Sequence, residues 1–251
     1  MRDKAGRAAV VLLVSVLKLL PAQSIAGVLS TVICSLARRF SPEESLIFLF
    51  DIENRLYEEQ GRRAVAYGQG KHTKHRHTKY HDFFVKRLSK EDKVIDLGCG
   101  NGTLAYTIAA KVQCPIQAID MSEANIRYAR SHHSSDKIEY HLGDILQDLP
   151  QEEFDVIILS NVLEHLGNRS ELLAELRTKL GVERFLIRVP LFERDWRIPL
   201  KKELGVEWRL DPTHETEYTI ESFNEELDRA GLRVRYHEIR WGEIWAEVVS
   251  A

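Results

Sequence analysis

The residues best suited to chemistry in this sequence are one glutamate and two histidines. Glu164 and His165 come just after the apolar run Phe154–Ser160, and His214 lies in the later segment Asp211–Thr219. A histidine can take a proton from a hydroxyl group near neutral pH, and a neighbouring carboxylate can orient its ring. We therefore expect His214 or His165 to act as a base, with Glu164 as its partner. The plainer alternative is that the pair caps a helix and His214 is an ordinary loop histidine.

A second candidate site surrounds the glycine-rich segment Val94–Gly102, which reads VIDLGCGNG. An apolar strand there runs directly into three glycines, which let a backbone turn sharply and approach a ligand. Asp96 precedes the first glycine, where its charge would repel pyrophosphate and suit an ammonium group. Asp120 ends the next apolar run, where it can accept hydrogen bonds from both hydroxyls of a ribose. These two acids distinguish the segment from a dinucleotide-binding loop, although a simple strand-to-helix turn would also use glycine.

Alternating strands and helices must position these residues. Strands are predicted at Val94–Leu97, Ile116–Asp120, Ile138–Leu142, Phe154–Ser160 and Phe185–Val189, and helices at Ser122–Ser131 and Ser170–Leu180. The tail reads as a helix at Ile220–Ala230 followed by strands near Leu232–Ile239 and Ile244–Val249. Because parallel strands end at one edge of a sheet, the glycine segment and Glu164 would lie at the same edge. The segment that carries His214 can fold over that edge.

From about Asp82 to Ala251 the chain resembles the class I S-adenosylmethionine-dependent methyltransferases. The Val94–Gly102 segment is similar to the first motif of that family, and Gly143–Ile145 is similar to its adenine-contacting turn. Phe154–Leu166 resembles its fourth motif. The resemblance implies an α/β, Rossmann-like sheet of seven strands with a C-terminal antiparallel hairpin and helices on both faces. It also implies S-adenosyl-L-methionine as the cofactor.

The resemblance assigns cofactor contacts to ten residues. They are Asp96, Gly98, Gly100, Asn101, Gly102, Asp120, Met121, Asp144, Ile145 and Ser160. Asp120 would bind the ribose and Asp144 the adenine amino group, while Ile145 and Met121 would sandwich the adenine ring. For Asp144, Ile145 and Met121 the alternative is capping or core packing.

Glu-His after the fourth strand, with a later histidine, resembles two groups within this family. One group contains the type 11, ubiquinone-pathway O-methyltransferases, and the other the small-RNA 2′-O-methyltransferases, which hold a divalent metal with Glu-x-x-Glu-His and a distant histidine. Asn161 stands here where that quartet begins with glutamate. Because an amide lacks the charge of a carboxylate, metal affinity should fall. A divalent metal is therefore not favoured, and no metal ligand is assigned.

The N-terminal run Ala8–Leu36 is strongly apolar, and Lys18 is its only formal charge. Arg2, Lys4, Arg7, Arg38 and Arg39 flank the run. Lys18 and Pro21 divide it into pieces that are short for a transmembrane helix. A signal peptide cleaved near Ala22–Ser24 would also fit, but a secreted enzyme would lack its methyl donor. We expect contact with the inner face of a membrane, dimerisation through Ile25–Leu36, or packing against the domain.

Three regions are therefore predicted: a helical extension at 1–60, a basic lid or linker at 61–92, and the methyltransferase domain at 93–251. Ser41 and Glu44 form a capping box for a helix that should end near Gly61. The basic region suits a phosphate or carboxylate on the substrate, although a solvated loop would look the same. The connection 190–212 should shape the acceptor pocket, because long ordered connections are usually functional.

Composition limits the function further. The 251 residues include 35 Lys and Arg against 38 Asp and Glu, and 44% are hydrophobic, which excludes long disorder and a polytopic membrane protein. The net charge of −3 gives no general attraction for nucleic acid. Three cysteines without zinc-site spacing favour a reducing compartment, here the cytoplasm. We expect O-methylation of a small-molecule, glycan or carrier-linked acceptor. The alternatives are RNA 2′-O-methylation and a non-catalytic binding module that retains the fold.

Overall fold

The computed structural model describes residues 2–69 and 72–251, with side chains from Ala8 onward apart from residue 9. Two compact units are present: residues 1–62 with 201–207, and residues 63–200 with 208–251. Lys71 and the side chains of Arg2, Lys4 and Arg7, which belong to the predicted basic clusters, lie outside the described residues.

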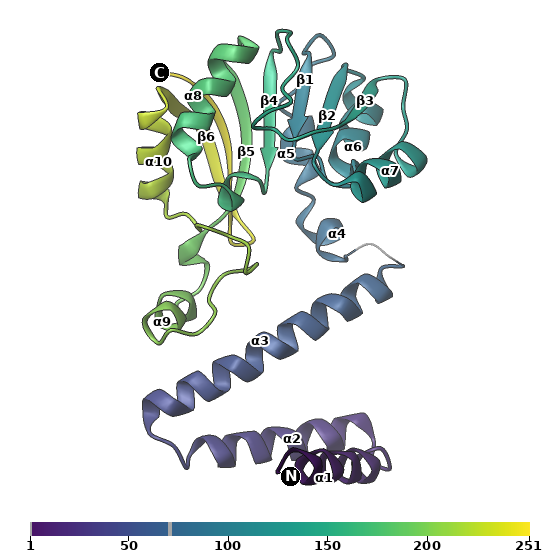
Figure 1. Ribbon diagram of the computed structural model, residues 1–251, viewed down its shortest axis with the longest axis vertical. Helices are drawn as coiled ribbons and strands as arrows, with labels where there is room; N and C mark the ends of the chain where they lie inside the picture. Colours follow the sequence, from purple (N-terminus) through teal and green to yellow (C-terminus); the bar gives the residue numbers. More distant parts are fainter. Residues whose placement is uncertain (1, 70–71) are drawn as a thin grey trace. The chain divides into compact units, whose positions relative to one another are not determined.

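The second unit is built on a seven-stranded sheet in the order β3-β2-β1-β4-β5-β7-β6 (Figure 1). The strands are β1 (Val94–Leu97), β2 (Ile116–Asp120), β3 (Ile138–Leu142), β4 (Val156–Ser160), β5 (Arg184–Pro190), β6 (Leu232–Arg240) and β7 (Glu243–Ser250). The first five strands are parallel, and β7 runs antiparallel to both β5 and β6. The predicted sheet with its C-terminal antiparallel hairpin is therefore confirmed.

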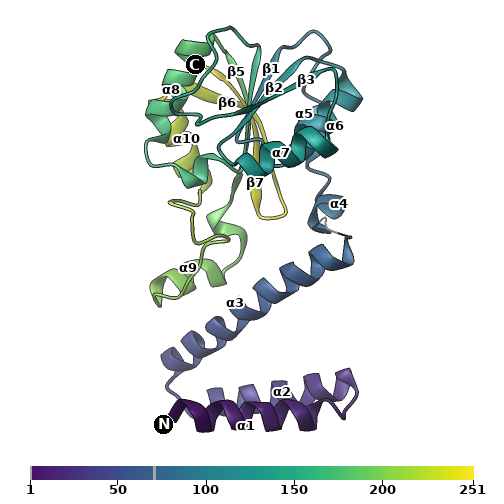
Figure 2. The same cartoon turned by 45° about the vertical axis from the view of Figure 1, so that its right-hand side comes forward.

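Helices cover both faces of the sheet (Figures 1 and 2). One core contains α8 (Arg169–Leu180) and α10 (Ile220–Arg229), and the other contains α5 (His81–Val85), α6 (Thr103–Val112) and α7 (Glu123–His132). Leu172, Leu173, Leu176 and Leu180 recur at helical spacing in α8, and all four are buried. Each such side chain contributes about 1.5–3 kcal/mol through burial, so the two cores hold the strand ends in fixed positions.

A long connection leaves the carboxyl end of β5 and returns to α10. It contains η2 (Phe192–Arg194) and α9 (Arg197–Glu203). Its two ends meet, because the Phe192 amide donates to the Tyr218 carbonyl at 2.7 Å and the Tyr218 amide donates to the Pro190 carbonyl at 3.1 Å. We call residues 191–218 the insertion. It closes on the edge where the parallel strands end.

The first unit contains α1 (Arg2–Leu17), α2 (Ala22–Ala37) and most of α3 (Pro42–Tyr67). Residues 18–21, which include Lys18 and Pro21, form a non-helical turn between α1 and α2. None of the helices in the described part of the chain is both long and apolar enough to cross a membrane. Lys201 of the insertion also belongs to this unit, where it is buried and bonds Glu53 at 2.9 Å and Asn54 at 2.8 Å.

Helix α3 starts as predicted but ends later. The Ser41 amide donates to Glu44 and the Glu44 amide donates to the Ser41 hydroxyl, which is the expected capping box. The predicted end near Gly61 is wrong, because the helix continues to Tyr67. Arg62 pairs with Glu58 and Glu59 one turn before it, and these pairs support the helix across the glycine. A short helix, α4 (Lys74–Thr78), follows in the basic region.

Candidate active site

A pocket of about 430 Å³ opens at the carboxyl edge of the sheet, within the second unit. Its volume is in the range that small-molecule ligands occupy. It is lined by His72, His75, Tyr80, Asp96, Gly98, Cys99, Gly100, Asn101, Thr103, Leu104, Tyr128, His133, Ser160, Asn161 and Arg188. The pocket therefore combines the glycine segment with the ends of β4 and β5 and with the basic region around α4.

Asp120 holds the glycine segment in shape. Its carboxylate accepts hydrogen bonds from the Gly100 amide at 2.8 Å, the Ser122 amide at 2.9 Å and the Asn125 side-chain amide at 3.1 Å. Gly100 has a φ of +55°, and a Cβ there would meet nothing within 4 Å. The open space above Gly100 is where a ligand can approach the backbone closely. A carboxylate has room for further hydrogen bonds, so the ribose role of Asp120 stays a prediction.

Asp96 is the acid in this pocket that has unused capacity. Its side chain is buried, and its Oδ2 atom has no hydrogen-bond partner among the residues that the structure describes. Burial, with a smaller contribution from the charge of Asp120, raises the pKa of Asp96 to about 7. A cationic group in the pocket would favour the ionised carboxylate and offset part of its desolvation. The site therefore fits a ligand with an ammonium or sulfonium group, as the sequence predicts for Asp96.

The ten predicted cofactor residues divide into two sets. Asp96, Gly98, Gly100, Asn101 and Ser160 line the pocket, whereas Gly102, Asp120, Met121, Asp144 and Ile145 do not. Gly102 packs on other groups, because a Cβ there would come within 2.6 Å of the Tyr140 hydroxyl. Asp144 accepts from the Leu146 amide at 2.9 Å and so caps its own turn.

Ile145 and Met121 are placed very differently by the structure. Ile145 is 9% exposed and belongs to the core, while Met121 is 79% exposed. Ile145 therefore packs in the core, which is the alternative that the sequence left open for it. The adenine sandwich between the two side chains remains a prediction.

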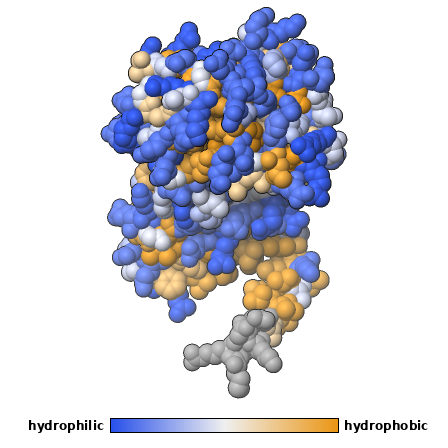
Figure 3. Space-filling model, turned by 45° about the horizontal axis from the view of Figure 1, so that its top comes forward, coloured by the Kyte–Doolittle hydropathy of each residue, from blue (hydrophilic) through white to orange (hydrophobic). Residues whose placement is uncertain are grey.

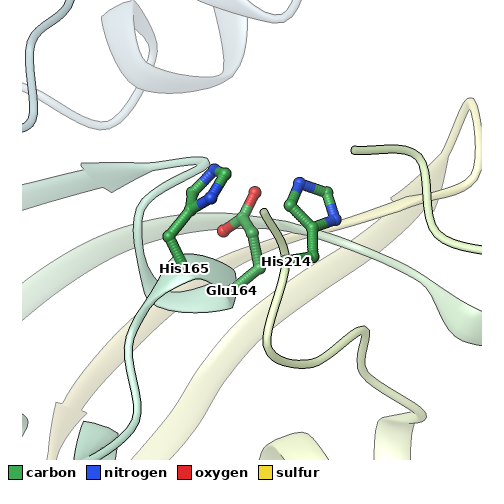
Figure 4. A group of neighbouring side chains, drawn as sticks. All are labelled: Glu164, His165 and His214. Carbon is green, nitrogen blue, oxygen red and sulfur yellow. The ribbon is translucent and has the colours of Figure 1, made fainter. Parts of the chain in front are cut away.

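Glu164, His165 and His214 do come together, as the sequence predicts. One ligand atom from each of the three side chains lies within 4.8 Å of the others (Figure 4). Glu164 and His165 belong to η1 (Leu163–His165), directly after β4, and His214 comes from the insertion. The insertion is tied to η1 because the amides of Glu215 and Thr216 donate to the Glu164 carbonyl at 2.8 and 3.2 Å. The rings of the two histidines meet edge to face at 4.7 Å.

Among the described residues Glu164 makes no hydrogen bond to either histidine, so its predicted role as the orienting partner stays a prediction. Both of its carboxyl oxygens are buried and neither has a hydrogen-bond partner. Burial raises the pKa of Glu164 to about 7, against smaller opposing effects that include the nearby His214. Glu164 is therefore a desolvated acid that faces the two rings and can exchange a proton near neutral pH.

His214 is instead hydrogen-bonded to a residue that the sequence analysis did not select. Its Nδ1 atom lies 3.1 Å from Oε1 of Glu217, and both side chains are buried. His165 is more exposed, and its Nδ1 atom lies 3.0 Å from the Thr213 hydroxyl. Burial, and then the charge of His214, lowers the pKa of His165. Of the two predicted bases, His214 is the one that a buried carboxylate holds in place.

Arg188 was also missed. It forms two hydrogen bonds with Glu243, at 2.7 and 2.5 Å, and its guanidinium lies 3.9 Å from the centre of the Tyr80 ring. The side chain is 7% exposed and lies between Ile187 and Val189 in strand β5, whereas Arg184 at the start of the strand is only partly buried. An arginine in the buried part of a strand must be paired, and that is the signal that could have marked Arg188. His72 and His75 line the same pocket, but burial and nearby cations lower the pKa of both, to about 4 for His75, so Arg188 supplies the positive charge among these three side chains at neutral pH.

The donor set of Glu164, His165 and His214 could also hold a divalent cation. The set contains one carboxylate and two imidazoles, a combination that suits transition metals better than Mg²⁺. Asn161 lies beside the pocket, and its Oδ1 atom is buried and lacks a hydrogen-bond partner. In the motif Asn161-x-x-Glu164-His165, this uncharged amide oxygen stands where a metal-binding quartet would have a carboxylate.

Known proteins share the glycine segment and the strands around it. Residues 88–190 match the family model described as a methyltransferase domain. The chain is 30% identical over 95 residues to the ubiquinone biosynthesis O-methyltransferase of Rickettsia akari, covering 37% of this chain and 37% of that protein. It is 34% identical over 86 residues to the enzyme of the same name from Pseudomonas syringae pv. tomato, covering 32% and 36%. These matches span little more than a third of either relative.

Solved structures show the same fold at lower identity. Magnesium protoporphyrin IX methyltransferase from Synechocystis PCC 6803, with bound SAH, superposes with a TM-score of 0.57 at 17% identity and covers 70% of this chain and 84% of that chain. A small RNA methyltransferase superposes with a TM-score of 0.58 at 17% identity and covers 68% and 25%. The two proteins carry names with very different acceptors, so the shared fold does not identify the acceptor here.

Proposed function

We propose that this chain, which carries a class I S-adenosylmethionine-dependent methyltransferase domain, methylates an oxygen atom of a small-molecule or glycan acceptor. The observation that carries the proposal is the buried histidine His214, held beside Glu164 at the sheet edge where the glycine segment ends. Methyl transfer to a hydroxyl group needs a group that accepts its proton. A nitrogen or sulfur acceptor would have less need of such a proton-accepting group.

The pocket residues bind and orient the methyl donor. S-adenosyl-L-methionine, when bound, supplies a methyl group on a positively charged sulfur. Asp96 offers a buried carboxyl with a free oxygen to the cationic part of the ligand, and Gly100 leaves room for its close approach to the backbone. Asp120 keeps that backbone in place. Orientation of two reactants can supply several kcal/mol of the barrier reduction.

The acceptor hydroxyl is deprotonated by His214. As the acceptor oxygen forms its bond to the methyl carbon, its proton passes to the free ring nitrogen of His214. The bond between that carbon and the donor sulfur breaks with both electrons left on sulfur, so charge is conserved. Glu164, whose pKa is raised to about 7, is placed to accept the proton afterwards.

Oxygen as the accepting atom is supported by the names of two curated relatives, ubiquinone biosynthesis O-methyltransferases at 30% and 34% identity, although another relative at 30% identity is named a ribosomal protein L11 methyltransferase. Methylation of the 2′-hydroxyl of RNA is the second candidate, favoured by the likeness to a small RNA methyltransferase and by the Glu-His-His cluster. The net charge of −3 and Asn161 in place of a glutamate both weaken it.

A radiolabelled methyl-transfer screen tests the proposal. The full chain is incubated with S-adenosyl-[methyl-³H]methionine and separate lipid, glycan, RNA and small-molecule fractions. Label stable to alkali in the glycan or small-molecule fraction excludes a methyl ester, and a product that mass spectrometry identifies as an O-methyl ether supports the proposal, whereas an N- or S-methyl product contradicts it. Label in RNA supports the second candidate. Loss of activity with EDTA, restored by Mg²⁺ or Mn²⁺, would assign His214 to a metal instead of a proton. Calorimetric binding without transfer to any fraction would leave the non-catalytic binding module.

A membrane is the partner that we propose for the first unit. Val10, Leu12, Leu19 and Val32 are 59%, 68%, 84% and 49% exposed, and apolar side chains gather over the N-terminal helices (Figure 3). Arg38 and Arg39 follow α2, and each basic residue near an anionic leaflet contributes about 1 kcal/mol. S-adenosylmethionine is an intracellular metabolite, so the cytoplasmic face is the one proposed.

Vesicle flotation tests the membrane proposal. The full chain should float with vesicles containing phosphatidylglycerol, and a chain without residues 1–40 should not, while both bind S-adenosylmethionine. A full-length chain that stays a monomer in the absence of lipid and detergent would contradict it. A dimer that requires Ile25–Leu36 would support the other occupant of this apolar surface, a second copy of the chain.

A further inference from the structure

Glu217 is a buried acid at the candidate active site, and both of its carboxyl oxygens have hydrogen-bond partners. Its side chain is 0% exposed. Oε1 accepts from the Leu210 amide at 2.6 Å and lies 3.1 Å from Nδ1 of His214, while Oε2 accepts from Arg194. Burial alone would raise the pKa of Glu217, but the hydrogen bonds from His214, Leu210 and Arg194 outweigh it and the pKa is lowered. The side chain is thus an ionised carboxylate, which can only accept hydrogen bonds.

An acceptor at this position decides which nitrogen of His214 carries the proton. Nδ1 must donate to Glu217, so the proton of the neutral ring is on Nδ1 and Nε2 keeps its lone pair. One ring nitrogen of His214 points toward Glu164 and the other points away (Figure 4). Since Nδ1 is bonded to Glu217, the nitrogen that faces Glu164 is Nε2. Nε2, the ring nitrogen that can accept a proton, therefore faces Glu164.

Arg194 fixes Glu217 and the insertion together. It donates to Glu217, to the Leu191 carbonyl at 2.9 Å and to the Trp208 carbonyl at 2.9 Å. Leu191 starts the insertion, and Trp208 lies in its returning half, after α9. The guanidinium thus joins both arms of the insertion to the carboxylate that holds the histidine.

We infer that Glu217 is the positioning residue of the active site: it holds His214 with Nδ1 protonated and Nε2 free to accept the proton of the acceptor hydroxyl. The inference rests on the proposed function for its last step, but its first step concerns the free protein. A buried carboxylate that selects the histidine tautomer can be worth several orders of magnitude in turnover, as in serine proteases.

Glutamine at position 217 is the sharpest test, because it changes one oxygen to an NH₂ group and little else. Arg194 and the Leu210 amide both donate to Glu217, and the charged guanidinium has the greater need of an oxygen, so we expect the NH₂ group of Glu217→Gln on the side of Leu210 and His214, where it leaves the Leu210 amide without its acceptor. It would then donate to Nδ1 and move the ring proton to Nε2. The ¹⁵N chemical shifts of the His214 ring, measured without acceptor, should show protonated Nδ1 in the wild type and protonated Nε2 in the variant.

Turnover gives the second measurement. With an acceptor found in the screen, Glu217→Gln should lower kcat about 10- to 1,000-fold, with the Kd of S-adenosylmethionine and the KM of the acceptor changed less than threefold. Glu217→Asp, which keeps the charge, should retain the wild-type tautomer and lose less turnover. Glu225→Gln, on the exposed face of α10, is the matched control and should change neither measurement.

The outcomes separate the inference from the proposed function. Protonated Nε2 in the wild type, or an unchanged tautomer in a folded Glu217→Gln variant, would overturn the inference. A tautomer that moves as expected in a protein that transfers no methyl group would support the positioning of His214 and contradict the O-methyltransferase proposal. Equal kcat in a variant whose tautomer has moved would show that Nε2 is not the base, and would also overturn the inference.

Discussion

The two halves of the candidate site each pair a bonded acid with an unbonded one, but the bonded acids do different work. Around the glycine segment, Asp120 is held by backbone amides and Asp96 has a free oxygen. Around the histidines, Glu217 is held by Arg194 and His214, and Glu164 has no partner. Asp120 thus shapes backbone, whereas Glu217 orients a side chain. Substitutions in the first half should therefore change cofactor affinity, and those in the second should change turnover.

The largest effect is expected from His214→Ala. Loss of the base should lower kcat by about 10²- to 10⁴-fold, while calorimetry shows unchanged S-adenosylmethionine affinity. The exposed His237→Ala is the control and should behave as wild type. A wild-type rate in the folded His214→Ala protein would remove the histidine half from the mechanism.

Asp120→Ala should produce the converse result. Losing contacts between a charged acceptor and two ribose hydroxyls should weaken S-adenosylmethionine binding about 10- to 100-fold. The change also frees the amides of Gly100 and Ser122, so thermal unfolding must be measured beside the calorimetry. Asp136→Ala, an exposed acid, serves as the control. Unchanged affinity in a folded variant would end the ribose assignment.

Asp96 predicts a pH dependence of stability. Its pKa in the folded chain, about 7, is above the usual value of 3.8, so the folded state binds this proton more tightly than the unfolded state. Without ligand, the free energy of unfolding should therefore fall as pH rises from about 4 to 7. Asp96→Asn should remove on the order of 1–2 kcal/mol of that fall. Urea unfolding at pH 5 and pH 8 measures it, and equal pH slopes for both proteins would refute the shift.

The smallest expected effect comes from alanine at two glycines, and it separates steric exclusion of the cofactor from the cost of backbone strain. Gly100 and Gly205 both have positive φ, +55° and +68°, and neither Cβ position has a neighbour within 4 Å. Alanine at either site should cost about 1–2 kcal/mol of stability. Gly100→Ala alone should also weaken S-adenosylmethionine binding about fivefold, because its methyl group fills the ligand space. Equal affinity in the two variants would place the cofactor elsewhere.

Sequence patterns predicted which residues gather in each half of the site better than they predicted the bonds between them. Continuous apolar runs located the strands, and their common edge then brought Glu164, His165 and His214 together. The partner of His214 could not be chosen in the same way. Asp211, Glu215 and Glu217 all lie within three residues of it, and only the burial of Glu217 under Arg194 singles that acid out. Such long-range packing leaves no periodic signal.

The end of helix α3 was mispredicted for a related reason. Helix α3 continues past Gly61, and the two Arg62 ion pairs, at a few tenths of a kcal/mol each, offset only part of the cost of about 0.5–1 kcal/mol that a glycine carries inside a helix. The exposure of Met121 and the burial of Ile145 likewise depend on tertiary packing that a turn motif does not encode.

The insertion begins and ends at the same place, because Leu191 and Tyr218 pair directly. A segment whose two ends are pinned side by side can be shortened, lengthened or replaced at little cost in loop-closure entropy and without shifting the strands beneath it. Related chains can therefore differ between residues 195 and 200 without disturbing His214, provided that Arg194 and the stretch from Leu210 to Tyr218 are inherited intact. If residues 195–200 contact the acceptor, as the proposed function implies, the choice of acceptor can change in evolution while the residues that hold His214 stay the same.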